Sequence, residues 1–192
     1  MRPSRAFDSG IAGIHPLERL ACALASTMHA ALLTLPHGPA FRFVDALDAL
    51  VPGRSGAARY LLRGDEAFLA GHFPGAPLMP GVLLIEAIAQ LGGIIAQSDP
   101  AIPPLPDLRL AAVHNTKITG SAIPGETLLL EAEVAGRMDS LVQIEGRVRI
   151  GSRLVLTTRL TLGGSRLPPE DRLEDKPLVP MPAQEIRHHR NP

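Results

Sequence analysis

Apolar and polar residues alternate along the second half of the chain with the period of two that is typical of β-strands. The apolar positions fall into three stretches: Leu128, Leu130, Ala132 and Val134; Val142, Ile144, Val148 and Ile150; Leu154, Leu156, Leu160 and Leu162. Gly151-Ser152 lies between the last two stretches as a two-residue turn. With the stretch from Leu108 to Ile118, the pattern predicts four antiparallel strands that have one apolar face to cover.

Residues 82–96, VLLIEAIAQLGGIIA, have apolar side chains on every side of a helix. We therefore expect a helix that is buried on all faces and that begins near Pro80. Two more strands are expected before it, Phe41 to Leu50 and Ala57 to Leu62, joined as a hairpin by the turn signal PGRSG of residues 52–56. The elements together predict an α+β fold in which an antiparallel sheet wraps round a long central apolar helix.

The ends of the chain differ from this middle part, so we expect residues 1–34 to be an N-terminal extension, residues 35–164 the folded domain and residues 165–192 a tail. A helical extension is predicted by apolar residues at spacings of three and four: Leu17, Leu20, Leu24, Met28 and Leu32. A secretory signal is the alternative, but Asp8 and Glu18 precede the apolar stretch. The tail is rich in Pro and charge without periodicity, which favours a flexible segment over a metal site at His188 and His189.

Charge and cysteine content narrow the function classes. Lys plus Arg and Asp plus Glu each number 19, so a formal net charge of zero gives no long-range attraction for nucleic acid or an anionic membrane. The lone Cys22 allows neither an internal disulfide nor a thiolate metal cluster, which makes a cytoplasmic location the default. No segment reaches the length that spans a bilayer.

Glu86 and Gln90 stand one turn apart within the apolar helix and are its only polar residues. An ionised carboxylate is costly in such surroundings, so burial favours the protonated form, which can act as a general acid. A structural pairing of Glu86 with a base elsewhere is the alternative reading.

His72 lies in the loop of residues 71–81, whose three Pro and three Gly hold the backbone in one path into the same helix. An isolated histidine is more often structural than catalytic. Here, however, it accompanies Glu86 and the free backbone NH groups that a helix start offers at Gly81 and Val82. These groups supply a base, an acid and donors for a developing enolate oxygen, which an elimination requires.

Residues 71–90, GHFPGAPLMPGVLLIEAIAQ, resemble the signature of the (3R)-hydroxyacyl-acyl carrier protein dehydratases of the FabZ type, which have the hot-dog fold. The shared features are the His, the following Phe-Pro-Gly, the Met-Pro-Gly helix start and an acidic residue fourteen positions after the His (86 minus 72). Weaker similarity covers LPHGPAFRFVDAL at residues 35–47 and IPGETLLLEAEV at residues 123–134. Glu86 matches the simple dehydratases, because the related dehydratase-isomerases carry Asp there.

The resemblance implies dehydration of a 3-hydroxyacyl thioester carried by acyl carrier protein, in fatty acid or related acyl-chain synthesis, without metal or cofactor. It implies a homodimer, with His72 of one subunit facing Glu86 of the other, and dimers grouped as a trimer of dimers. His72 acts as the base and Glu86 as the acid. The substrate-binding residues expected from the motif are the following: Phe73, Leu78, Gly81, Val82 and Gln90.

The chain departs from the family pattern at two places. Family members carry an Arg-Tyr pair after the histidine that matches His37, and this chain has Gly38 and Pro39. That tyrosine lines or gates the acyl tunnel, so its absence leaves the control of chain length open. In the family, a cluster of basic residues serves docking of the carrier protein. Here only Lys117 of that cluster is basic, and the neighbouring positions hold Asn115, Thr119 and Gly120.

Two other functions remain open from the residues. A hot-dog thioesterase would share the fold and direct water at the thioester carbonyl, which explains Glu86 more easily than His72. A binding module without turnover is a non-enzyme alternative, and it explains poorly why both His72 and Glu86 are present.

Overall fold

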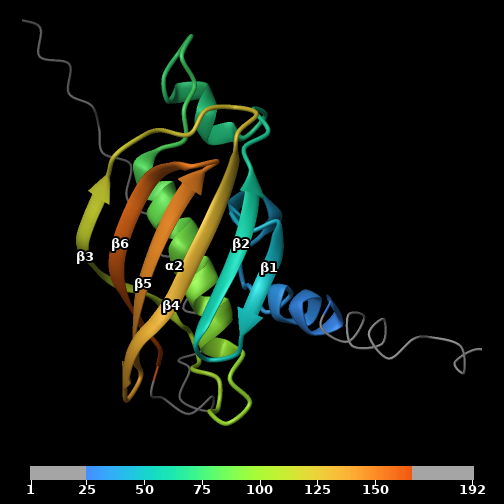
Figure 1. Cartoon of the computed structure of the whole chain (residues 1–192), viewed down its shortest axis with the longest axis vertical. Coiled ribbons are helices and arrows are strands. Elements are labelled where there is room, and N and C mark those ends of the chain that lie inside the picture. Colours follow the sequence, from blue (N-terminus) through green and yellow to red (C-terminus); the bar gives the residue numbers. More distant parts are fainter. Residues whose placement is uncertain (1–24, 166–192) are drawn as a thin grey trace, which may run out of the picture.

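A six-stranded antiparallel sheet wraps round one long helix, α2 (Gly81–Gln97), in the computed structural model, which describes residues 25–165 (Figure 1). The strands are β1 (Ala46–Val51), β2 (Ser55–Leu61), β3 (Arg109–Ile118), β4 (Thr127–Met138), β5 (Leu141–Ile150) and β6 (Arg153–Gly163). Their order across the sheet is β1-β2-β4-β5-β6-β3, and every neighbouring pair is antiparallel. The structure confirms the α+β prediction, the four late strands and the hairpin.

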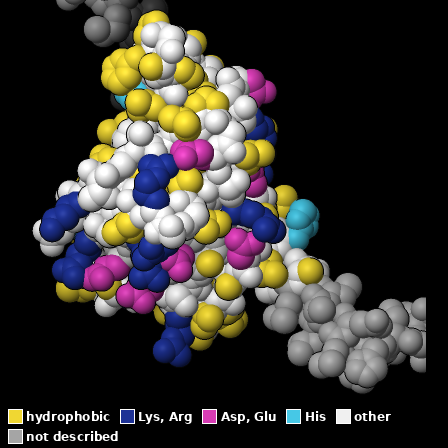
Figure 2. Space-filling view, turned by 45° about the horizontal axis from the view of Figure 1, so that its top comes forward, with side chains coloured by type: hydrophobic (Ala, Val, Ile, Leu, Met, Phe, Trp, Pro, Cys, Tyr) yellow, Lys and Arg dark blue, Asp and Glu magenta, His cyan; other side chains and the backbone are white. Residues whose placement is uncertain are grey.

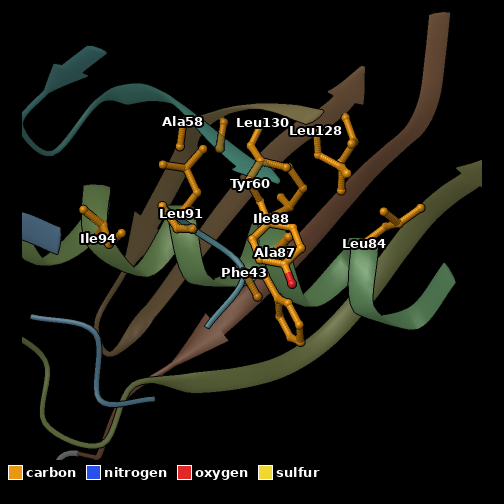
Figure 3. Packing of buried hydrophobic residues seen from close by; sticks show 14 of the residues in the cluster. Phe43, Ala58, Tyr60, Leu84, Ala87, Ile88, Leu91, Ile94, Leu128 and Leu130 are labelled. Atoms are coloured by element: carbon orange, nitrogen blue, oxygen red, sulfur yellow. The ribbon is translucent and has the colours of Figure 1, made fainter. Parts of the chain in front are cut away.

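The alternating apolar residues of the strands face α2 and form the core with it. Leu128 and Leu130 of β4 are fully buried, as are Ile88 and Leu91 of α2. Figure 3 shows these side chains packed together between helix and sheet. Apolar residues at every second position give each of these strands one apolar face. These faces pack against the apolar helix, as the sequence indicated.

The helix is not buried on all faces in the single chain, so that prediction is wrong. Val82 is 68% exposed, and the Glu86 and Gly93 side of α2 is only partly covered. The sheet packs against α2 through β2, β4, β5 and β6 and leaves this side of the helix to loop segments and to a cavity.

The first strand begins at Ala46 and not at Phe41, which corrects the predicted boundary. Pro39–Phe41 form a 3-10 turn, η1, and residues 42–45 cross over α2. The physical reason is a side chain: Gln90 bonds the backbone of Phe41 and Phe43, so these groups do not pair with a strand.

Residues 25–32 form a helix that continues the expected N-terminal amphipathic pattern. Ala31 is buried, and Met28 and Leu32 pack against the core. The rest of the extension and the tail after residue 165 lie outside the described residues, as do Cys22, His188 and His189. Within residues 25–165, no helix combines the length and hydrophobicity needed to cross a membrane.

Gly146 lets α2 approach β5 closely, and we expect Gly146→Ala to destabilise the fold. An added Cβ would lie 2.4 Å from a methyl group of Ile88 and 3.2 Å from the Glu131 carbonyl oxygen. Ile88 is fully buried and β-branched, so it cannot turn away and the helix must shift. The free energy of unfolding, measured in urea, should fall by about 1–3 kcal/mol.

Gly136 on the neighbouring strand β4 is the matched control, because a Cβ there meets no atom within 4 Å. Gly136→Ala should leave stability unchanged or slightly higher. Equal losses in both variants would show that strand glycines matter through backbone freedom and not through the contact with Ile88.

Candidate active site

The loop that carries His72 is fixed to the sheet by Glu66. The Glu66 carboxylate accepts hydrogen bonds from the backbone NH groups of Arg63 at 2.8 Å and Gly64 at 2.7 Å, and from the Tyr60 hydroxyl at 3.0 Å. Burial alone would raise the pKa of Glu66, but these donors outweigh it and hold the pKa below its ordinary value. The ionised carboxylate therefore anchors η2 (Ala67–Gly71), which His72 directly follows.

His72 is oriented by Leu78, across the turn of the Pro-rich loop. The His72 Nδ1 atom lies 3.0 Å from the Leu78 carbonyl oxygen, and the Leu78 NH donates to the His72 carbonyl at 2.8 Å. A carbonyl only accepts, so Nδ1 carries a proton, and in the neutral ring Nε2 is left as a free base. The Phe73 ring stacks on the imidazole with centroids 4.3 Å apart.

The start of α2 presents free donors beside this loop. Within the described chain the NH groups of Gly81 and Val82 have no acceptor, and Leu83 is the first residue of the helix whose NH bonds back, to Pro80. A Cβ at Gly81 would lie 2.6 Å from Cδ1 of the half-exposed Ile118, so this side chain would have to turn aside. Small size at this residue keeps the backbone donors accessible to an oxygen atom.

Glu86 lies one turn further along α2 and contacts two polar side chains. Its Oε1 accepts a hydrogen bond from Gln90 Nε2 at 3.0 Å and lies 3.3 Å from His37 Nε2. Gln90 also donates to the Phe41 carbonyl at 2.9 Å and accepts from the Phe43 NH at 2.8 Å. Glu86 and Gln90 share one face of the helix, as the sequence predicted. Both the oxygen and the nitrogen of the Gln90 amide are hydrogen-bonded within the chain.

A cavity of about 270 Å³ opens along this face of α2. Most of its lining residues are apolar. The polar ones are Glu86, His37, Gln90, Thr34, Gln97 and Asp107. The apolar ones include Leu35, Ala89, Ile94, Leu105, Leu108, Leu110 and Leu162. An apolar cavity with a carboxyl group on its wall can hold an acyl chain with its reactive end at Glu86.

A larger hollow of about 570 Å³ lies across β1 to β6 and includes neither His72 nor Glu86. Its rim carries the ion pairs Arg147–Glu131 and Arg159–Glu145. Figure 2 shows such mixed positive and negative side chains over the lower part of the view. The smaller cavity is the candidate site, because it contains the candidate acid and an apolar wall.

One chain does not bring His72 and Glu86 together. Within residues 25–165 they form no mutual ion pair: His72 bonds Leu78, and Glu86 contacts Gln90 and His37. The sequence did not predict the contact between His37 and Glu86. This contact agrees in part with the alternative reading, in which Glu86 pairs with a base elsewhere in the chain. The signal was the match of residues 35–47 to the family's opening segment, where His37 is a shared residue.

Gly38 and Pro39 stand where the family has its arginine and tyrosine, respectively. A Cβ on Gly38 would meet no atom within 4 Å, and neither residue lines the cavity. Tyr60, the only tyrosine, is 3% exposed and bonded to Glu66, so it does not replace the missing side chain.

An antiparallel sheet wrapped round a central helix defines the hot-dog fold, and in this chain a histidine lies in the loop before the helix and a carboxyl group in the helix itself. Solved structures share the fold: the dehydratase heterocomplex ApeI:P from Xenorhabdus doucetiae has a TM-score of 0.58 at 15% identity, covering 68% of this chain and 88% of that one. Thioesterase superfamily member 2 from zebra fish has a TM-score of 0.56 at 12% identity, covering 74% and 98%. At these identities the likeness concerns the fold alone.

The chain belongs to the FabA-like family, because the model of the FabA-like domain matches residues 35–159. A curated relative, 3-hydroxyacyl-acyl-carrier-protein dehydratase FabZ from Natranaerobius thermophilus, is 36% identical over 130 residues, which are 66% of this chain and 89% of the relative. The match agrees with the resemblance seen in residues 71–90.

Proposed function

We propose that this protein is a dehydratase that converts 3-hydroxyacyl thioesters on acyl carrier protein to trans-2-enoyl thioesters in fatty acid or related acyl-chain synthesis. The observation that carries the proposal is the state of the His72 ring: Nδ1 donates to Leu78 and leaves Nε2 as a base beside free backbone donors. Membership of the FabA-like family and curated relatives named as dehydratases support the same reaction.

The reaction divides between two proton transfers. His72 Nε2 removes a proton from the carbon next to the thioester carbonyl, and the electrons move to the carbonyl oxygen. The NH groups of Gly81 and Val82 stabilise that oxygen. The electrons then form the carbon–carbon double bond while Glu86 protonates the hydroxyl on the next carbon, which leaves as water.

The other motif residues serve binding and orientation. Leu78 fixes the tautomer of His72, and Phe73 stacks on its ring and is exposed beside it. Gln90 lines the acyl cavity, but the hydrogen bonds of its side-chain amide are made within the chain. It therefore supports the reaction by holding Glu86 in place.

We further propose that the working unit is a homodimer paired through β3, with each site taking His72 from one subunit and Glu86 from the other. Strand β3 bonds only to β6, which leaves its other edge without a strand partner among the described residues. Val113 and Ile118 on β3 are exposed apolar residues, and so are Phe73 and Val82 near the site. Figure 2 shows hydrophobic side chains gathered toward the upper end of the molecule, where the loop before α2 lies.

The partner that delivers the substrate is acyl carrier protein, which holds the acyl chain on a phosphopantetheine arm. Lys117 at the end of β3 is the basic residue retained for docking this acidic partner. A trimer of dimers and a cytoplasmic location stay predictions.

The proposal is tested by following the absorbance of the enoyl thioester when the protein meets 3-hydroxyacyl-carrier substrates of several chain lengths. Interconversion of hydroxyacyl and enoyl forms is the expected result. Release of free thiol without enoyl formation would instead identify a thioesterase. Tight acyl binding without either product would identify a binding module.

A further inference from the structure

The mechanism above assigns no role to His37, although this residue contacts the proposed acid, Glu86. The His37 Nε2 atom lies 3.3 Å from Glu86 Oε1, and both side chains line the apolar cavity. They remain 31% and 19% exposed, respectively. The backbone of His37 is held by Arg42, whose Nη2 donates to the His37 carbonyl at 3.3 Å.

The orientation of Gln90 decides what Glu86 Oε1 does. Gln90 Oε1 accepts the Phe43 NH, so the amide nitrogen must be the atom that faces the Phe41 carbonyl and Glu86. An amide nitrogen only donates. Glu86 Oε1 is therefore an acceptor.

The Nε2 atom of His37 also lies 3.3 Å from this oxygen, within ion-pair distance. A proton on Nε2 satisfies this contact. The other ring nitrogen, Nδ1, is buried and has no hydrogen-bond partner among the described residues. A neutral ring protonated on Nε2 leaves Nδ1 as a bare acceptor, which costs less than burying an unpaired NH of an imidazolium.

When Glu86 carries a proton, an oxygen that accepts from two donors must be the carbonyl oxygen of the acid. Within residues 25–165, Glu86 Oε2 has no hydrogen-bond partner, and it is the oxygen left to carry a proton. A general acid must present its proton to the leaving group in the right direction. His37 and Gln90 together thus select which oxygen of Glu86 delivers it.

We propose that His37 is a positioning residue for Glu86, donating from Nε2 to Oε1 so that Oε2 holds the proton transferred to the departing hydroxyl. The inference rests on the proposed dehydration. It gives a role to the contact between His37 and Glu86, to which the mechanism above assigns none.

The test compares His37→Phe, which keeps a planar ring without a donor, with His37→Gln, whose amide nitrogen can reach the place of Nε2. In His37→Phe, kcat for dehydration should fall by about 10- to 100-fold while KM changes less than about threefold, because the lost bond acts in proton delivery. His37→Gln should recover most of the loss. His37→Leu, also without a donor, is measured alongside so that a folding defect in one variant does not decide the result.

A second comparison places His37→Phe in a Glu86→Gln background, where it should cause no further loss. Retention of kcat in both donor-free variants would overturn the inference, and so would an equal loss in the Glu86→Gln background or a change in KM alone. These outcomes are distinct from failure of the proposed function, in which the wild-type protein itself would form no enoyl product and both proposals would fall.

Discussion

Dehydration should fall by about a hundredfold to ten-thousandfold in both His72→Ala and Glu86→Gln, with each variant still folded. In the proposed mechanism His72 supplies the free Nε2 base, and the only hydrogen bond of its side chain among the described residues is the one to Leu78. In the same mechanism Glu86, which lies on the cavity wall, supplies the acid. Neither side chain belongs to the buried core, so the substitutions remove chemistry and not packing.

The measurement is kcat/KM for enoyl thioester formation, with the melting temperature as a check on folding. The exposed His29 and Glu133 provide matched controls, and His29→Ala and Glu133→Gln should keep wild-type rates. A Glu86→Gln variant that keeps its rate would remove the carboxyl group from the mechanism.

Co-expression of the two inactive chains tests whether the site spans two subunits. In a mixed dimer, one site combines the intact His72 of one chain with the intact Glu86 of the other, and the second site has lost both groups. Random assortment should therefore restore about one quarter of the wild-type activity. Activity that stays at the level of the single variants would place both groups of each site in one chain.

The sequence predicted the sheet and the helix well because their signals are local. Alternation in β4, β5 and β6 and the unbroken apolar run of α2 each follow from which face a side chain covers. The start of β1 was misplaced because the segment from Phe41 is bonded by Gln90, 49 residues further along the chain. No periodicity within residues 41–45 reports such a contact.

In the candidate site, too, the sequence predicted the contacts between residues that lie close together along the chain. The spacing of Glu86 and Gln90 puts them on one helix face, and their hydrogen bond follows from it. The family motif singled out both His72 and Leu78, and the structure shows them bonded across six residues of one loop. The approach of His37 to Glu86 depends on how two distant segments cross, and only the structure reveals it.

Gln90→Met should lower the free energy of unfolding by about 2–5 kcal/mol, because it removes the partners of two buried backbone groups. Gln90 is 2% exposed, and its amide satisfies both the Phe43 NH and the Phe41 carbonyl. Methionine has a similar length and fills the space, but it can replace neither bond. The loss should therefore come from unpaired polar groups and not from a cavity.

Urea unfolding at one fixed protein concentration measures the effect, since association would otherwise change the apparent stability. Gln143 on β5 is the control, because its side chain is partly exposed and makes no hydrogen bond among the described residues, so Gln143→Met should stay within about 0.5 kcal/mol of wild type. If Gln90→Met were as stable as the control, the buried ring of Phe43 would be sufficient to hold the segment over α2.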